Sequence, residues 1–160
     1  MKHLIAAVSV MVLATPAMAQ NATHIAKAQA GKSCAGCNLF QAEMSDTDVT
    51  GKSFAGSRLR QADFSFAIAN TANFSRSDMR DVEGYGIRAT SANFAYANLT
   101  NASFVGAYLR GVNFKGANLT GVNFAGADLT HARGLTQDQL DAACGDESTV
   151  LPKGLSLKSC

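Results

Sequence analysis

Apolar residues recur along most of this 160-residue chain with a period of five. From Ala97 to Thr130 a typical unit is a small apolar residue, Asn or Asp, Leu or Phe, and then two small or polar residues. A step of five residues turns an α-helix by about 140° past a full turn, so these apolar residues would not share one helical face. Within a unit, however, the two apolar residues are two positions apart, which places both on one side of a short extended segment. Each unit therefore predicts one side of a coil, with a corner after it, and the coils stack.

The register of the repeat extends well beyond its clearest part. Counting back by fives from Leu129, it can be followed to Leu39 without an insertion or deletion. Phe and Leu alternate with a period of ten, and only a four-sided coil of 20 residues sorts them into separate columns. One predicted column contains Phe54, Phe74, Phe94 and Phe114, and another contains Leu59, Met79, Leu99 and Leu119.

Residues 82–89 depart from the repeat because large and small residues exchange places. Val82 and Ile87 occupy positions that are small elsewhere, and Gly84 and Ala89 occupy positions that are large elsewhere. Such an exchange conserves the core volume when the side chains repack. Two interpretations remain open, namely a local repacking or bulge within the coil and a loop that leaves the coil.

The repeat resembles that of the pentapeptide-repeat family, commonly summarised as Ala-(Asp/Asn)-Leu-x-x, over roughly residues 39–132. The resemblance implies an all-β solenoid, a right-handed quadrilateral β-helix of about five coils, here over residues 34–134. Five coils about 4.8 Å apart would form a rod roughly 24 Å long. The family also implies a scaffold for protein interactions, and some of its members protect DNA gyrase by mimicking DNA.

The segment 135–160 is predicted to cover the C-terminal end of this rod. Thr136 and Gln139 have the spacing of a capping box, which predicts a short helix from Gln137 to Cys144 with Gly145 as its stop. A disulfide between Cys144 and Cys160 would pin the tail to this helix. Closing a loop of this length contributes about 3 kcal/mol in the chain-entropy model.

Residues 1–19 have the layout of a secretory signal peptide, with a positive start, an apolar run to Ala14 and the small-x-small site Ala17-Met18-Ala19. An uncleaved anchor is the alternative, although the run is shorter than the roughly 20 residues that a membrane span needs. Cleavage near Ala19-Gln20 predicts a periplasmic or secreted protein without a membrane segment. Residues 20–33 are expected to be a flexible N-terminal segment. The cleaved chain would carry 13 basic and 12 acidic residues, too even a balance to attract nucleic acid.

Cys34 and Cys37 form a C-x-x-C motif with three interpretations. An even number of cysteines in an exported chain favours disulfides, and the extrapolated register points both side chains inward. A redox pair is the first alternative, but the βαβ context of thioredoxin-like proteins is missing. Half of a metal site is the second, but His24 and His131 lack ligand-like spacing to the motif. Haem attachment needs a histidine where this chain has Asn38.

No other motif predicts chemistry, so we expect neither an enzyme nor a cofactor. Asn98, Asn101 and Asn118 begin N-glycosylation sequons, which we interpret as by-products of the repeat. The serine, histidine and aspartate residues do not converge into a catalytic arrangement in this register.

Stacked coils also align their outward side chains every 20 residues. One outward column contains Asp48, Ile68, Arg88, Tyr108 and Asp128, and the preceding one contains Ser65, Tyr85, Val105 and Ala125. Around the corner between these columns we predict an interaction patch of Phe66, Ile68, Tyr85, Arg88, Val105 and Tyr108. Aromatic residues and arginine on a polar surface are typical of protein interfaces. The alternative is a purely local cation–π contact between Arg88 and Tyr108.

The sequence thus predicts a non-enzymatic, exported scaffold with an unidentified protein partner, and a homo-oligomer is also compatible with it. A thiol–disulfide redox protein that uses Cys34 and Cys37 is the alternative. A DNA-mimicking gyrase-binding protein is disfavoured by the signal peptide and the near-zero net charge.

Overall fold

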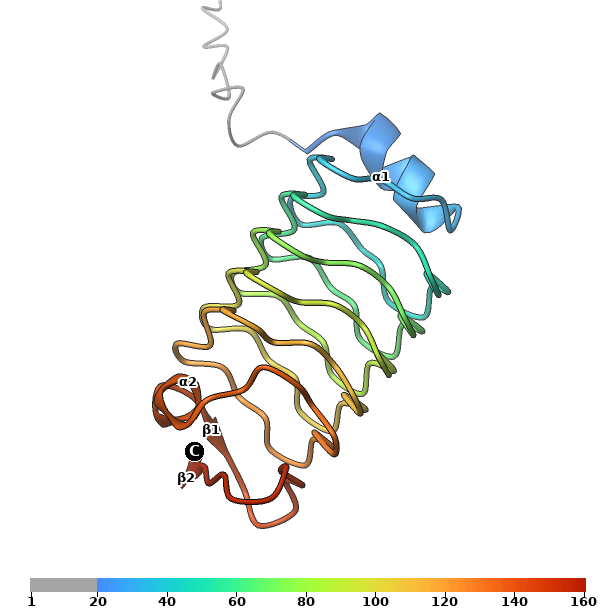
Figure 1. Cartoon of the computed structure of the whole chain (residues 1–160). Coiled ribbons are helices and arrows are strands. Elements are labelled where there is room, and N and C mark those ends of the chain that lie inside the picture. The colour runs from blue at the N-terminus through green and yellow to red at the C-terminus, as the bar shows by residue number, and fades with distance from the viewer. Residues whose placement is uncertain (1–19) are drawn as a thin grey trace, which may run out of the picture.

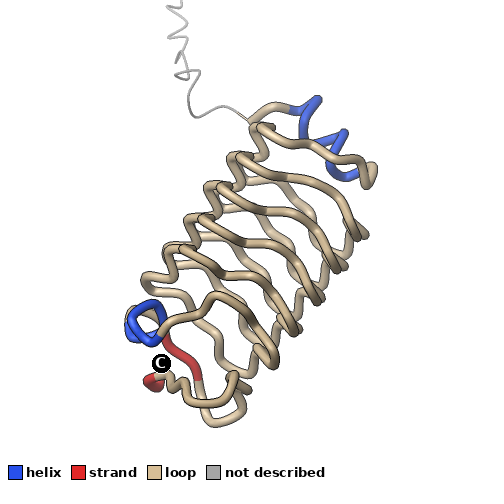
Figure 2. The backbone as a smooth tube through the Cα atoms, in the orientation of Figure 1, coloured by secondary structure: helices blue, strands red, loops and turns tan. Residues whose placement is uncertain are grey.

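The computed structural model describes residues 20–160, and the expected signal peptide, residues 1–19, lies outside them. The described chain forms a rod of stacked coils, with α1 at one end and α2, β1 and β2 at the other (Figure 1). These elements are α1 (Ala22–Gln29), α2 (Gln137–Asp141), β1 (Cys144–Gly145) and β2 (Lys158–Ser159). The rest of the rod is drawn as loop because its coils pair through isolated bridges rather than long strands (Figure 2). Within this described part, no helix has the length and apolar character of a membrane span.

The spacing of the parallel β-bridges between neighbouring coils gives the number of residues in one coil. They join residues 20 positions apart, from Asn38 and Arg58 at one end to Asn113 and Arg133 near the other. The central inward residue of a typical unit donates its backbone N–H to the next coil; Phe94, for example, bonds to the carbonyl oxygen of Asn113 at 2.9 Å. The predicted coil of 20 residues is therefore confirmed.

The core consists of the inward columns that the sequence predicts. The rings of Phe54, Phe74, Phe94 and Phe114 stack in sequence, with centroids 5.4, 5.0 and 5.6 Å apart. The Leu and Met column on another side is buried as well. Rings of different columns meet edge to face, as Phe94 and Phe104 do at 5.9 Å. This close stacking removes the large inward side chains of these columns from water.

The frequent Asn and Asp residues of the repeat have a structural cause. At the outward position their side-chain oxygen accepts a hydrogen bond from the backbone N–H two residues later, as Asn118 does from Thr120 at 3.0 Å. Asn98 accepts bonds from both the N–H and the hydroxyl of Thr100, at 3.2 and 2.6 Å. This turn stabilises the corner that follows. The geometry explains why sequon-like triplets recur at Asn98 and Asn118.

Residues 82–89 remain in the regular coil, so the alternative of a loop is wrong. Bridges from Glu83 to Ser103 and from Arg88 to Tyr108 keep the register through this stretch. Val82 and Ile87 are buried and fill the core from the neighbouring positions. The ring of Phe104 occupies the space beside Gly84, where an added Cβ would lie 2.8 Å from Phe104 Cδ1. The exchange of sizes is therefore a repacking without a bulge.

The C-terminal end closes the rod differently from the prediction in one detail. The capping box is present, but α2 ends at Asp141, and Cys144 and Gly145 instead form β1, which pairs in parallel with β2. Gln139 explains the position of α2, because its side-chain amide donates to the edge carbonyls of Phe114 and Ala117, at 3.0 and 2.8 Å. The carbonyl oxygen of Ala117 is one that another coil would otherwise pair with, as the N–H of Asn118 does with Ala97 one coil earlier, so the helix satisfies an acceptor at the open edge.

The expectation that residues 20–33 are flexible is wrong. They contain α1, which begins after Asn21, whose side chain accepts a hydrogen bond from the N–H of His24 at 3.0 Å. Ala28 is fully buried against the core, and Ile25 packs beside it. His24 Nδ1 accepts a bond from the N–H of Asn38 at 3.1 Å, which satisfies a donor at the edge of the first coil. The helix forms because the open end of the rod offers it an apolar surface and unpaired backbone groups.

Candidate interaction surface

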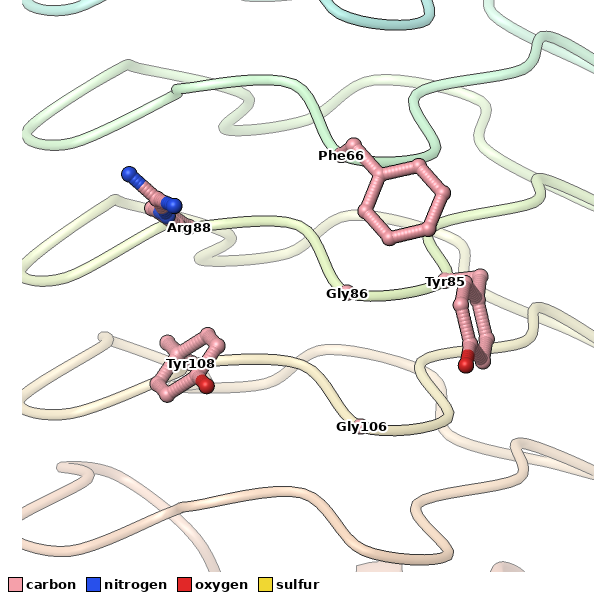
Figure 3. A pocket seen from close by; sticks show the side chains of 6 residues that line it. All are labelled: Phe66, Tyr85, Gly86, Arg88, Gly106 and Tyr108. Carbon is pink, nitrogen blue, oxygen red and sulfur yellow. The ribbon is translucent and has the colours of Figure 1, made fainter.

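The predicted patch lies around one corner of the rod, on successive coils. Tyr85, Gly86 and Arg88 belong to one coil, Phe66 to the coil before it, and Tyr108 to the coil after it. Figure 3 shows Phe66 and Tyr85 on one side of Gly86 and Gly106, and Arg88 and Tyr108 on the other. We call the four side chains of Phe66, Tyr85, Arg88 and Tyr108 the aromatic corner.

The backbone of the repeat explains how these side chains come to face solvent. Tyr85 lies two residues after the outward residue Glu83, whose side chain accepts a hydrogen bond from the N–H of Tyr85 at 3.1 Å. Phe66 is the last residue of its corner and has a φ of 58°. This left-handed conformation is uncommon for a large side chain, and it points the ring outward. The exposed fractions are 54% for Phe66, 48% for Tyr85 and 54% for Tyr108.

The aromatic rings on one side of the corner are held by close contacts. The rings of Phe66 and Tyr85 meet edge to face, with centroids 5.2 Å apart and an interplanar angle of 85°. Phe66 also lies against Gly86, where an added Cβ would be 3.1 Å from Phe66 Cδ1 and Cε1. The two rings therefore present a defined surface despite their exposure.

A hollow of about 310 Å³ lies between the two sides of the corner. It is lined by Phe66, Tyr85, Gly86, Arg88, Gly106 and Tyr108. An added Cβ at Gly106 would meet nothing within 4 Å, so the hollow is open above this residue. It combines aromatic walls with one cation, which suits a partner side chain of mixed character.

Of the described residues that line this hollow, Arg88 alone carries a formal charge. Among residues 20–160, its guanidinium group has no side-chain hydrogen bond, ion pair or cation–π contact. The cation–π contacts of this part of the chain are instead Arg58 over Phe40 and Arg76 over Tyr96. The alternative of a local Arg88–Tyr108 cation–π pair is therefore wrong.

The carboxylates nearest along this outward column are engaged elsewhere. The hydroxyl and N–H of Thr50 bond to Asp48 and hold the pKa of its carboxyl below the ordinary value. Asp128 lies 3.8 Å from Arg110. Neither carboxylate lines the hollow, so Arg88 faces it without a neutralising group.

Two residues of the predicted patch, Ile68 and Val105, do not contribute to the hollow. Ile68 and Val105 are half-buried and do not line the hollow, because neighbouring coils cover part of each side chain. Sequence reasoning in turn missed Gly86 and Gly106, which form the floor. The signal for them was available, since both are corner glycines adjacent in register to the predicted aromatic residues.

The four cysteines lie at the two ends of the rod as two disulfides, Cys34–Cys37 and Cys144–Cys160. Cys34 and Cys37 are exposed by only 1% and 6%, and Cys34 Sγ lies 3.7 Å from the carbonyl oxygen of His24 in α1. A redox pair is normally reachable by its substrate and sits at a helix N-terminus, whereas α1 precedes this pair and covers it. Within residues 20–160, no group of three or more His, Cys, Asp or Glu side chains is arranged to hold a metal ion.

Comparisons with known proteins agree with this architecture. The model of the family "Pentapeptide repeats" matches eight copies in this chain, at residues 57–83 and 90–125. No curated protein matches the chain.

Several solved pentapeptide-repeat structures are similar to this chain. Rfr23, from the cyanobacterium Cyanothece 51142, has a TM-score of 0.65 and 18% sequence identity, over 81% of this chain and 97% of that one. A protein of the Arabidopsis thaliana thylakoid lumen has a TM-score of 0.47 and 30% identity, over 61% of this chain and 60% of that one. HetL from the cyanobacterium Nostoc has a TM-score of 0.40 and 20% identity, over 82% of this chain and 63% of that one. Residues 57–83 and 90–125 thus match pentapeptide repeats, and the coils of 20 residues agree with the right-handed quadrilateral β-helix in which pentapeptide-repeat proteins fold.

Proposed function

We propose that this protein is an exported, non-enzymatic scaffold that binds a partner protein through its aromatic corner. One observation carries the proposal. Three large aromatic side chains, each about half exposed, gather with Arg88 around a hollow, while most outward positions of the rod are small or polar. Exposed aromatic residues beside an arginine are characteristic of the residues that dominate binding energy at protein interfaces.

The rod around this corner favours binding through its rigidity. Backbone hydrogen bonds join each coil to the next, and a disulfide lies at either end of the fold. A surface that is ordered before binding loses little conformational entropy when a partner docks, which favours affinity. A repeat scaffold of this kind contributes a fixed arrangement of side chains and needs no catalytic group.

The double substitution of Tyr85→Ser and Tyr108→Ser tests the corner. We expect it to lower partner affinity at least about 30-fold, since the loss of even one hot-spot aromatic residue costs 2 kcal/mol or more. The free energy of unfolding should change by less than about 1 kcal/mol, because both side chains are largely exposed. The measurement is affinity capture from the exported fraction of the source organism, followed by mass spectrometry and a binding titration with the captured protein.

Tyr96→Ser is the matched control, because Tyr96 is 52% exposed but lies on another corner, beside Arg76. It should leave the same partner bound with unchanged affinity. Equal affinity for the wild type and the double variant would contradict the proposed role of the aromatic corner.

Export is part of the proposal and has its own test. Two disulfides at the ends of a small domain are typical of oxidising compartments, and the first 19 residues have the composition of a signal peptide. We expect the intact mass of the protein from the source organism to correspond to a chain that begins near Gln20, with no thiol that an alkylating reagent can modify. A full-length chain with four free thiols would refute export and the oxidised ends together.

A further inference from the structure

Two corner glycines of this rod act as shelves, that is, as flat backbone surfaces against which an aromatic ring of the preceding coil lies. The ring of Phe66 lies against Gly86, and the ring of Tyr96 lies against Gly116, where an added Cβ would be 2.7 Å from Tyr96 Cδ1. In both pairs the aromatic residue precedes the glycine by 20 positions, so it stands at the same corner one coil earlier. The missing Cβ lets the ring approach the backbone closely.

Gly106 is a shelf of the same kind without a ring. The residue at its corner one coil earlier is Gly86, which has no side chain to cover it. An added Cβ at Gly106 would meet nothing within 4 Å, and Gly106 lines the hollow together with Tyr85 and Tyr108 (Figure 3). The space above Gly106 therefore matches a planar ring in the way that the space above Gly86 does.

Arg88 adds a requirement for charge, since it lines the same hollow. Its guanidinium group points away from Gly106 in Figure 3, and its exposed side chain has to turn to meet a ligand there. Its guanidinium group is unpaired among the described residues and is the only charged group that lines the hollow. Guanidinium groups bind carboxylates through two parallel, charge-assisted hydrogen bonds. A ligand that satisfies both Gly106 and Arg88 consequently carries an aromatic ring and a carboxylate.

We propose that the hollow binds the C-terminal residue of a partner protein when that residue is aromatic. Its ring lies on Gly106 between Tyr85 and Tyr108, and its terminal carboxylate pairs with Arg88. A hollow of about 310 Å³ is at the small end of ligand sites and accommodates one residue. Only a terminal aromatic residue has the ring and a carboxylate within one residue. This inference rests on the proposed function of the aromatic corner as the docking surface.

The test titrates isotope-labelled protein with three peptides and follows its backbone amide signals by NMR. The probes are acetyl-Gly-Gly-Phe with a free carboxylate, the same peptide as its C-terminal amide, and acetyl-Gly-Gly-Ala with a free carboxylate. We expect saturable shifts at Gly86 and Gly106 with the first probe. The amide should bind about tenfold more weakly, as the loss of one charge-assisted pair implies, and the alanine peptide should not saturate.

Two pairs of variants place the ligand groups. Gly106→Asn puts a side chain on the shelf and should abolish binding, and Arg88→Gln should reduce the affinity of the acid to that of the amide. Gly56→Asn is the control for the first variant, since Gly56 and Gly106 have φ values of 66° and 65° and open space at both Cβ positions. Arg76→Gln is the control for the second, because it makes the same change in net charge at another corner. Both controls should bind the acid as the wild type does.

The possible failures separate this inference from the function on which it rests. Equal affinity for acid and amide, or binding that survives Gly106→Asn, overturns the recognition of a terminal aromatic residue. If no peptide binds while the Tyr85→Ser and Tyr108→Ser variant still loses its partner, the terminal-residue inference fails and the docking surface stands. If that variant keeps its partner, the proposed function of the corner fails.

Discussion

Replacing Phe94 by alanine is expected to destabilise the rod by about 3–5 kcal/mol, the usual cost of removing a fully buried phenylalanine. Phe94 lies between the rings of Phe74 and Phe114, at 5.0 and 5.6 Å, and meets the edge of Phe104 at 5.9 Å. Its truncation removes stacking on both sides and leaves a cavity in the middle of the column. The surrounding coils cannot collapse into this cavity, because their backbone hydrogen bonds fix the distance between neighbouring turns.

Guanidinium unfolding followed by far-UV circular dichroism measures this loss as a lower midpoint. Phe66→Ala is the matched control, because Phe66 is the same residue type but is 54% exposed and belongs to the aromatic corner. We expect the control to cost no more than about 1 kcal/mol. A Phe94→Ala variant as stable as the Phe66→Ala variant would contradict the stacked-column account of stability.

The core of the rod could be predicted from the sequence because its physical rule is simple. The two inward positions of each unit must be apolar, and stacking in columns sorts Phe54, Phe74, Phe94 and Phe114 onto one side. Residues 82–89 were ambiguous because they depart from this rule of large and small inward positions. The pattern alone shows that Gly84 breaks the rule, but it does not show that the ring of Phe104 fills the space beside Gly84.

The ends of the rod were harder to predict because no repeat governs them. Helix α1 is short and weakly amphipathic as a sequence, and it forms because the first coil offers it an apolar surface and the unpaired N–H of Asn38. At the other end the capping box of Thr136 and Gln139 was visible, but Gly145 lies in β1 and does not stop the helix. Contacts between residues distant in sequence determine both that α1 forms and where α2 ends.

The candidate site was predictable in its outward side chains and not in its shape. The column rule brings Tyr85, Arg88 and Tyr108 together from the sequence alone. The hollow depends in addition on the lack of side chains at Gly86 and Gly106. It also depends on Arg88 making no cation–π contact with any ring in residues 20–160. Rotamers of exposed side chains follow from local packing, so periodicity does not specify them.

Gly134→Ala is expected to destabilise the C-terminal end by about 2–5 kcal/mol, because it combines backbone strain with a collision. Gly134 has a φ of 70°, and an added Cβ would lie 2.7 Å from both Cα and N of Lys115. These are backbone atoms of the preceding coil, so a rotamer change cannot relieve the overlap. Gly134 is the point at which the chain leaves the regular coil to begin α2, since Arg133 still pairs with Asn113 and Thr136 is the N-cap.

Gly154→Ala separates the backbone strain of an alanine at positive φ from the collision of its Cβ with a neighbouring coil. Gly154 has a φ of 81° but nothing within 4 Å of an added Cβ, so its substitution carries the strain alone, about 1–2 kcal/mol. Amide hydrogen exchange should show lost protection for Gly121 and Leu140 in the Gly134→Ala variant, because their N–H groups bond to Ala142 and Thr136 only while α2 is seated on the last coil. If the two variants were equally stable and equally protected, the close approach to Lys115 would not be what positions α2. Gly134 lies where the chain leaves the regular coil. We therefore expect an added Cβ at this position to displace α2 and the C-terminal segment that follows it, while Phe94 and its column stay packed.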